Sequence, residues 1–126
     1  MTHPLLEALQ VNEAQFIALR RRFHQQPEIG FEEHQTSSEV ARLLGEWGYE
    51  VHRGLAGTGV VGTLRVGHGK KRLGLRADMD ALRVSEQRES AYQSRISGLS
   101  HGAGRDGIMA IQLGAAELLN RHKSQL

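Results

Sequence analysis

Apolar positions recur along the first half of the chain with the spacing of α-helices. Phe16, Leu19 and Phe23 follow one another at intervals of three and four residues, which places them on one helical face. Pro27 has no backbone N–H to continue such a helix. The pattern therefore predicts an amphipathic helix over Glu13–Gln25.

Two further helices are predicted in the same way. One starts at Thr36–Ser38 and stops at Gly48, where a glycine suits the left-handed C-cap position. The apolar face of this helix would consist of Val40, Leu43, Leu44 and Trp47. The other covers Asp106–Arg121, with an apolar stripe made of Met109, Leu113, Ala116 and Leu119.

Between these helices the pattern changes to that of strands. Short runs rich in apolar and β-branched residues, separated by glycine, predict strands at Tyr49–His52, Thr58–Val66 and Leu73–Ala77. The last of these opens the stretch Leu73–Leu82 (LGLRADMDAL). The polar stretch Arg83–Leu99 is predicted to be a surface loop.

The predicted order is α-α-β-β-β-α, within one α/β domain that covers residues 1–126. Three strands would leave one edge of the sheet without a partner. A further strand would be expected after the last helix. The chain therefore has the organisation of the front half of a larger α/β domain.

Two stretches carry candidate chemistry. The segment Leu73–Leu82 closes on Asp78 and Asp80, and ligand sites in open α/β sheets collect beyond the carboxyl ends of strands. About twenty residues later, His101–Ile108 (HGAGRDGI) leads into the last predicted helix. We expect everything else to hold these two stretches together.

Composition narrows the classes of function. The chain is 39% hydrophobic and 24% charged, has 16 Lys and Arg against 14 Asp and Glu, and contains no cysteine. Its basic residues are scattered, which argues against nucleic-acid binding. The N-terminus does not have the pattern of a signal peptide. No apolar run approaches the roughly 20 residues that are needed to span a bilayer. We therefore expect a soluble cytoplasmic protein that binds no membrane.

Three blocks of the sequence resemble the N-terminal part of the M20-type metallo-amidohydrolases. The blocks are RRFHQQPEIGFEEHQTSSEVARLLGEWGYEV, GLAGTGVVGTL and LGLRADMDAL. They are most similar to the branch of hippurate hydrolases and indole-acetyl-amino-acid hydrolases. The resemblance implies a partial zinc-peptidase-like αβα sandwich that lacks its C-terminal half and the smaller dimerisation domain. It also implies N-acyl amino acid substrates and a pair of divalent metals (Zn, Mn or Co).

The second stretch departs from the family pattern His-Ala-Cys-Gly-His-Asp-Gly-His. The position of the ligand cysteine is Ala103, that of the ligand histidine is Arg105, and that of the last histidine is Ile108. Alanine and isoleucine have no donor atom, and a guanidinium repels a cation. The family's general-base glutamate and further ligands would lie beyond residue 126. We therefore expect no metal cofactor in the chain as it stands, and a deficiency in catalysis.

Several roles for the remaining site residues stay open. Asp78 and Asp80 match acidic positions of the family, and Asp80 is the candidate for a vestigial catalytic residue in this chain. Asp78 and His101 are weak candidates for metal ligands. The two aspartates could instead be a solvated pair, or hold Mg²⁺ or Ca²⁺ through carboxylate oxygens. Asp106 is expected to cap or begin the last helix, in support of the site. Arg105 could form an ion pair with Asp78, Asp80 or Asp106.

Five histidines are expected on surfaces or in loops, without the spacing of metal ligands. These are His24, His34, His52, His68 and His122.

Three functional hypotheses follow. The chain is the N-terminal segment of an amidohydrolase, or a degenerate and non-catalytic fragment that folds without metal. Alternatively, it is an interaction module that forms a homo-oligomer or binds a partner through its open sheet edge.

Overall fold

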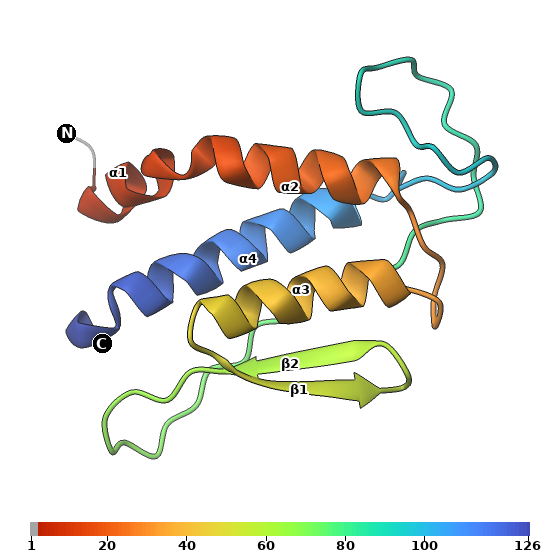
Figure 1. Cartoon of the computed structure of the whole chain (residues 1–126). Helices are drawn as coiled ribbons and strands as arrows, with labels where there is room; N and C mark the ends of the chain where they lie inside the picture. The colour runs from red at the N-terminus through yellow and green to blue at the C-terminus, as the bar shows by residue number, and fades with distance from the viewer. Residues whose placement is uncertain (1–2) are drawn as a thin grey trace.

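The computed structural model describes residues 3–126 and has helices and a small sheet (Figure 1). Within these residues the α-helices are α1 (Pro4–Val11), α2 (Glu13–Gln25), α3 (His34–Glu46) and α4 (Arg105–Arg121). The strands are β1 (Glu50–Leu55) and β2 (Gly59–Thr63), and a short 3-10 helix, η1 (Lys123–Gln125), follows α4. No helix among the described residues is long and apolar enough to cross a membrane.

The three predicted helices are confirmed, with small shifts at their ends. The helix predicted from Thr36 starts two residues earlier, and the last helix starts at Arg105. Gly48 has a φ of +85° directly after the C-cap of α3, so the predicted left-handed stop is present. Helix α1 was not predicted. It begins with a proline, and the His3 side chain accepts a hydrogen bond from the Leu5 N–H at 3.1 Å.

The hydrophobic core lies where α2, α3 and α4 meet. Figure 1 shows these helices side by side, with the β1–β2 hairpin next to α3. The core cluster of buried residues is Leu19, Phe23, Leu43, Leu44, Met109 and Leu113. Each of the three helices contributes two of them. The apolar faces seen in the sequence thus turn toward one another.

The sheet has two antiparallel strands in the described part of the chain, with Glu50 opposite Thr63 and His52 opposite Val61. The strands predicted around Tyr49–His52 and Thr58–Val66 are therefore confirmed with shifted ends.

The third strand, predicted at Leu73–Ala77, was wrong. This segment has no regular secondary structure and pairs with neither strand of the sheet. The Leu73 side chain is 86% exposed and that of Leu75 is 56% exposed. A strand needs a neighbour to satisfy its backbone groups, and the apolar pattern of a single segment carries no information about that neighbour.

The end of this segment is nevertheless hydrogen-bonded to segments that connect the helices. The Ala81 N–H donates to the Glu28 carbonyl at 2.8 Å, and Leu82 forms an isolated antiparallel bridge with Ser100. The stretch Arg83–Leu99 between these two contacts contains no helix or strand, as predicted. Segments far apart in sequence, each carrying candidate site residues, are thereby brought together.

Candidate functional site

Asp78 and Asp80 line a cleft of about 420 Å³. Another acid, Glu33, also lines this cleft; it is buried and accepts a hydrogen bond from the Thr58 hydroxyl at 3.1 Å. The structure thus places the two aspartates beside a hollow of the molecule, although not at the end of a strand.

Arg105 forms an ion pair with Asp80. Its Nη1 donates to Asp80 Oδ1, and the two side chains are 30% and 34% exposed. Of the three partners considered from the sequence, the structure selects this one. Asp78 forms an ion pair with a different arginine: Arg76 Nη2 lies 3.0 Å from Asp78 Oδ1. Both candidate acids are therefore paired with arginine.

His101 is buried at 4% exposure, directly before the turn that leads into α4. Neither of its ring nitrogens has a hydrogen-bond partner within residues 3–126. Burial lowers the pKa of His101, and the negative charge of Asp106 only partly opposes this effect. The imidazole is thus neutral at neutral pH and has a lone pair available on one nitrogen.

Asp106 lies in the first turn of α4, one residue after the helix begins, and is fully buried. Its Oδ2 accepts from Arg20 Nε at 2.9 Å and lies 2.8 Å from His24 Nδ1. Both partners belong to α2, which α4 packs against. Asp106 therefore joins two helices through a buried ionic contact.

The prediction that His24 lies on the surface was wrong. Its side chain is 11% exposed, and its Nε2 lies 2.8 Å from Glu86 Oε1. The hydrogen bond from His24 and another from the Ser94 N–H lower the pKa of Glu86. His24 thus connects the core to the loop over Arg83–Leu99. Its partners are 82 and 62 residues away in sequence, so no local spacing could have indicated this role.

The donor atoms of the described residues do not fit a metal centre. Within residues 3–126 no three His, Asp or Glu side chains are grouped so that they could hold a metal ion. Ala103 and Ile108, at two of the expected ligand positions, provide no donor atom. At the third position, Arg105 brings a positive charge to Asp80. The arrangement suits an ion pair better than a cation site.

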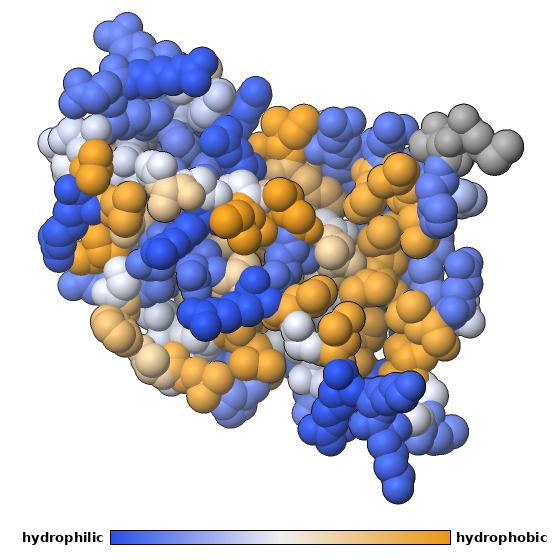
Figure 2. All heavy atoms as spheres, turned by 180° about the vertical axis from the view of Figure 1, so that it is seen from behind, coloured by the Kyte–Doolittle hydropathy of each residue, from blue (hydrophilic) through white to orange (hydrophobic). Residues whose placement is uncertain are grey.

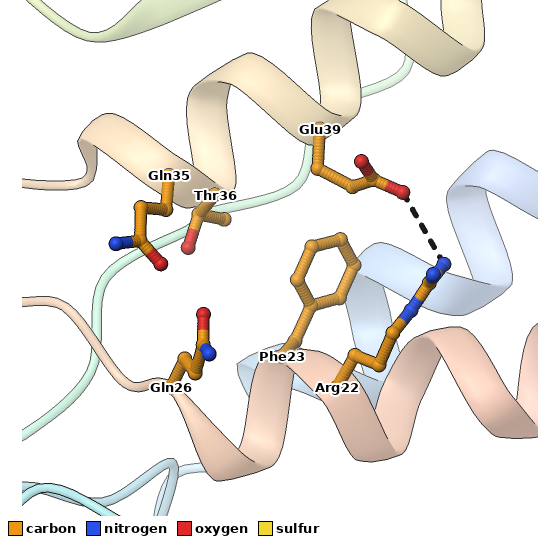
Figure 3. A pocket seen from close by; sticks show the side chains of 6 residues that line it. All are labelled: Arg22, Phe23, Gln26, Gln35, Thr36 and Glu39. Atoms are coloured by element: carbon orange, nitrogen blue, oxygen red, sulfur yellow. Dashed lines mark hydrogen bonds and ion pairs between the residues drawn. The ribbon is translucent and has the colours of Figure 1, made fainter.

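A second cavity, of about 230 Å³, lies between the end of α2 and the start of α3 (Figure 3). Its lining residues are Arg22, Phe23, Gln26, Gln35, Thr36 and Glu39. Arg22 and Glu39, which both line the cavity, form an ion pair at 3.2 Å, and the Thr36 hydroxyl donates to Glu28. The charged and hydroxyl groups of this cavity are thus engaged with one another or with neighbours. We assign no chemistry to it.

Comparisons with known proteins identify relatives. A Campylobacter jejuni hippurate hydrolase is 42% identical over 107 residues, which are 85% of this chain and 28% of that protein. An IAA-amino acid hydrolase (ILR1-like 5) of Arabidopsis thaliana is 41% identical over 110 residues, which are 87% of this chain and 25% of that protein. A scan against family models found no match.

Solved structures agree with these sequence matches. A Bacillus subtilis protein, YXEP, described as a dinuclear metal binding peptidase from the M20 family, superposes with a TM-score of 0.87 at 31% identity. The match covers 93% of this chain and 33% of that one. A candidate aminohydrolase from methicillin-resistant Staphylococcus aureus gives a TM-score of 0.89 at 33% identity, over 95% of this chain and 32% of that one.

The chain thus spans between a quarter and a third of the length of these relatives. Within that span, both sequence and fold agree, and the predicted partial α/β fold is confirmed apart from its third strand. The chain is homologous to a segment of the M20-type metallo-amidohydrolases and peptidases.

Proposed function

We propose that this chain is a catalytic-type domain segment of an M20-type amidohydrolase, with the amide bond of N-acyl amino acids as the ancestral target, and that it does not catalyse hydrolysis as it stands. The substrate class is supported by relatives named for hippurate and for IAA-amino acid conjugates. The single observation that carries the loss of catalysis is the Arg105–Asp80 ion pair at the candidate site.

The chemistry of amide hydrolysis explains why this pair matters. In metal-dependent hydrolysis, a divalent metal held with an open position activates water, and a nearby base takes the proton. Here the carboxylate of Asp80 already faces a guanidinium, and Ala103 and Ile108 offer no donor. His101 retains a free nitrogen, but one imidazole does not hold a metal tightly. The described residues therefore lack the set of donor atoms that would hold a metal and its activated water.

An assay on hippurate tests this proposal. The purified protein is incubated with Zn²⁺, Mn²⁺ or Co²⁺, and glycine release is followed, with the Campylobacter jejuni hippurate hydrolase as the active control. We expect release no faster than in buffer, because the site cannot position a metal-bound water. Metal-dependent release above that background would contradict the proposed loss of catalysis.

A second candidate function is protein interaction. Neither outer edge of the hairpin has a partner strand among the described residues, and large apolar side chains such as Val61, Leu75 and Ile111 are exposed. Figure 2 shows apolar surface spread over the back of the molecule. Such surface supports pairing with a second copy of the chain through β2. A strictly monomeric particle at high concentration would oppose this proposal.

A further inference from the structure

Each of the three aspartates around the candidate site faces an arginine of the protein itself. Asp80 pairs with Arg105, and Asp78 pairs with Arg76. Fully buried Asp106 is held by Arg20. Glu33, which also lines the cleft, is buried and accepts a hydrogen bond from the Thr58 hydroxyl, but it has no ion pair among the described residues. The acids neutralised by arginine in this region are therefore the three aspartates.

Of these pairs, only that of Asp80 and Arg105 bridges the acidic segment and a helix. Asp80 belongs to the irregular stretch 73–82, whereas Arg105 is the first residue of α4. Arg76, in contrast, pairs with Asp78 two residues away and has an 88% exposed side chain. Loss of the Arg105 charge would leave a partly buried carboxylate beside the cleft, with no other ion pair to it among the described residues.

Arg105 is the cation that pairs with Asp80 among the described residues. Its guanidinium stays protonated at any physiological pH, so the positive charge that faces Asp80 is permanent.

We infer that Arg105 is a built-in cation, which neutralises Asp80 and fastens the end of the segment 73–82 to the start of α4 without a metal. Metal-binding relatives belong to the same fold, and in this chain the guanidinium makes that part of the fold independent of divalent ions. This role of Arg105 rests on the proposed function, because it assumes that the chain is a segment of a metal-dependent amidohydrolase.

Thermal melting of matched variants in metal-free buffer tests the inference. Arg105→Gln removes the charge, Arg105→Lys keeps it, and Arg76→Gln removes an equivalent charge from the neighbouring, exposed pair. We expect Arg105→Gln to lower the Tm by about 3–5 °C, as the loss of a favourable partly buried ion pair does in a domain of this size. The Tm of Arg105→Lys should lie closer to that of the natural protein. Arg76→Gln should shift it by about 1 °C or less, since its pair is screened by water.

The natural protein is also melted with excess EDTA and with added Zn²⁺ or Mn²⁺, and its Tm should not change. The inference is overturned if Arg105→Gln melts like the natural protein, if Arg105→Lys is as unstable as Arg105→Gln, or if EDTA lowers the Tm of the natural protein. Hydrolysis of hippurate would overturn the proposed function instead, and would leave the comparison of the variants' melting temperatures unaffected.

Discussion

Replacing Asp106 with alanine should cost about 3 kcal/mol or more in the free energy of unfolding, as the removal of one partner from a buried ionic contact does. The carboxylate is completely buried and holds both Arg20 and His24 of α2. Without it, the positive charge of Arg20 loses its partner at the junction of α2 and α4. Because the Arg20 side chain is 37% exposed and can reach water, the lower end of the usual range applies.

Urea denaturation of Asp106→Ala and Asp78→Ala measures this difference. Asp78 also pairs with an arginine, but its side chain is 44% exposed. The control should lose about 1 kcal/mol or less, as expected for a surface ion pair. Equal losses in the two variants would show that burial of Asp106 does not determine the stability of the helix junction.

Replacing Leu19 with alanine should destabilise the fold by about 2–5 kcal/mol, the usual cost of removing a large side chain from a packed core. Leu19 is 1% exposed and belongs to the cluster that joins α2, α3 and α4. Truncation removes buried methyl groups and leaves a cavity that three helices cannot close without moving.

Ile17→Ala is the matched control, since Ile17 lies on the same helix and is 44% exposed. We expect a change of roughly 0.5 kcal/mol or less in its free energy of unfolding, as is usual for surface substitutions. Similar denaturation midpoints for the two variants would contradict the assignment of the core to this helix face.

The helices could be predicted because their signals are local. The spacing of Phe16, Leu19 and Phe23 defines one face of α2. Gly48 is a local signal for the end of α3, since glycine readily adopts the positive φ that this position has. Helix α1 spans only eight residues, a length at which the helical spacing of Leu5 and Leu9 does not distinguish a helix from other short apolar runs. Its proline and the His3 cap were the signals that could have identified it.

The third strand could not be judged from local pattern. Leu73 and Leu75 have the alternation of a strand, but a strand also depends on a neighbour that supplies hydrogen bonds. Within the described residues that neighbour is lacking, and both side chains remain exposed. The apolar pattern is therefore real, while the element it predicts does not form here.

The candidate site was partly predictable. Opposite charges at Arg105 and three nearby acids indicated an ion pair, yet only the structure selects Asp80. The buried contact of His24 with Asp106 and Glu86 had no sequence signal, because it depends on how α2 meets α4 and the loop. The metal-binding roles considered for Asp78 and His101 remain predictions.

Elemental analysis of the purified natural protein tests the central proposal, that the chain holds an Arg105–Asp80 ion pair at the candidate site and no divalent metal. The protein is incubated with Zn²⁺, Mn²⁺ or Co²⁺, freed of excess ions by desalting, and analysed for retained metal per chain. We predict that no stoichiometric metal is retained, because Asp80 is already paired with Arg105 and the side chains of Ala103 and Ile108 have no donor atom. A tightly held equivalent of any of the three metals would contradict the claim and would show that Asp78, Asp80 and His101 still form a site.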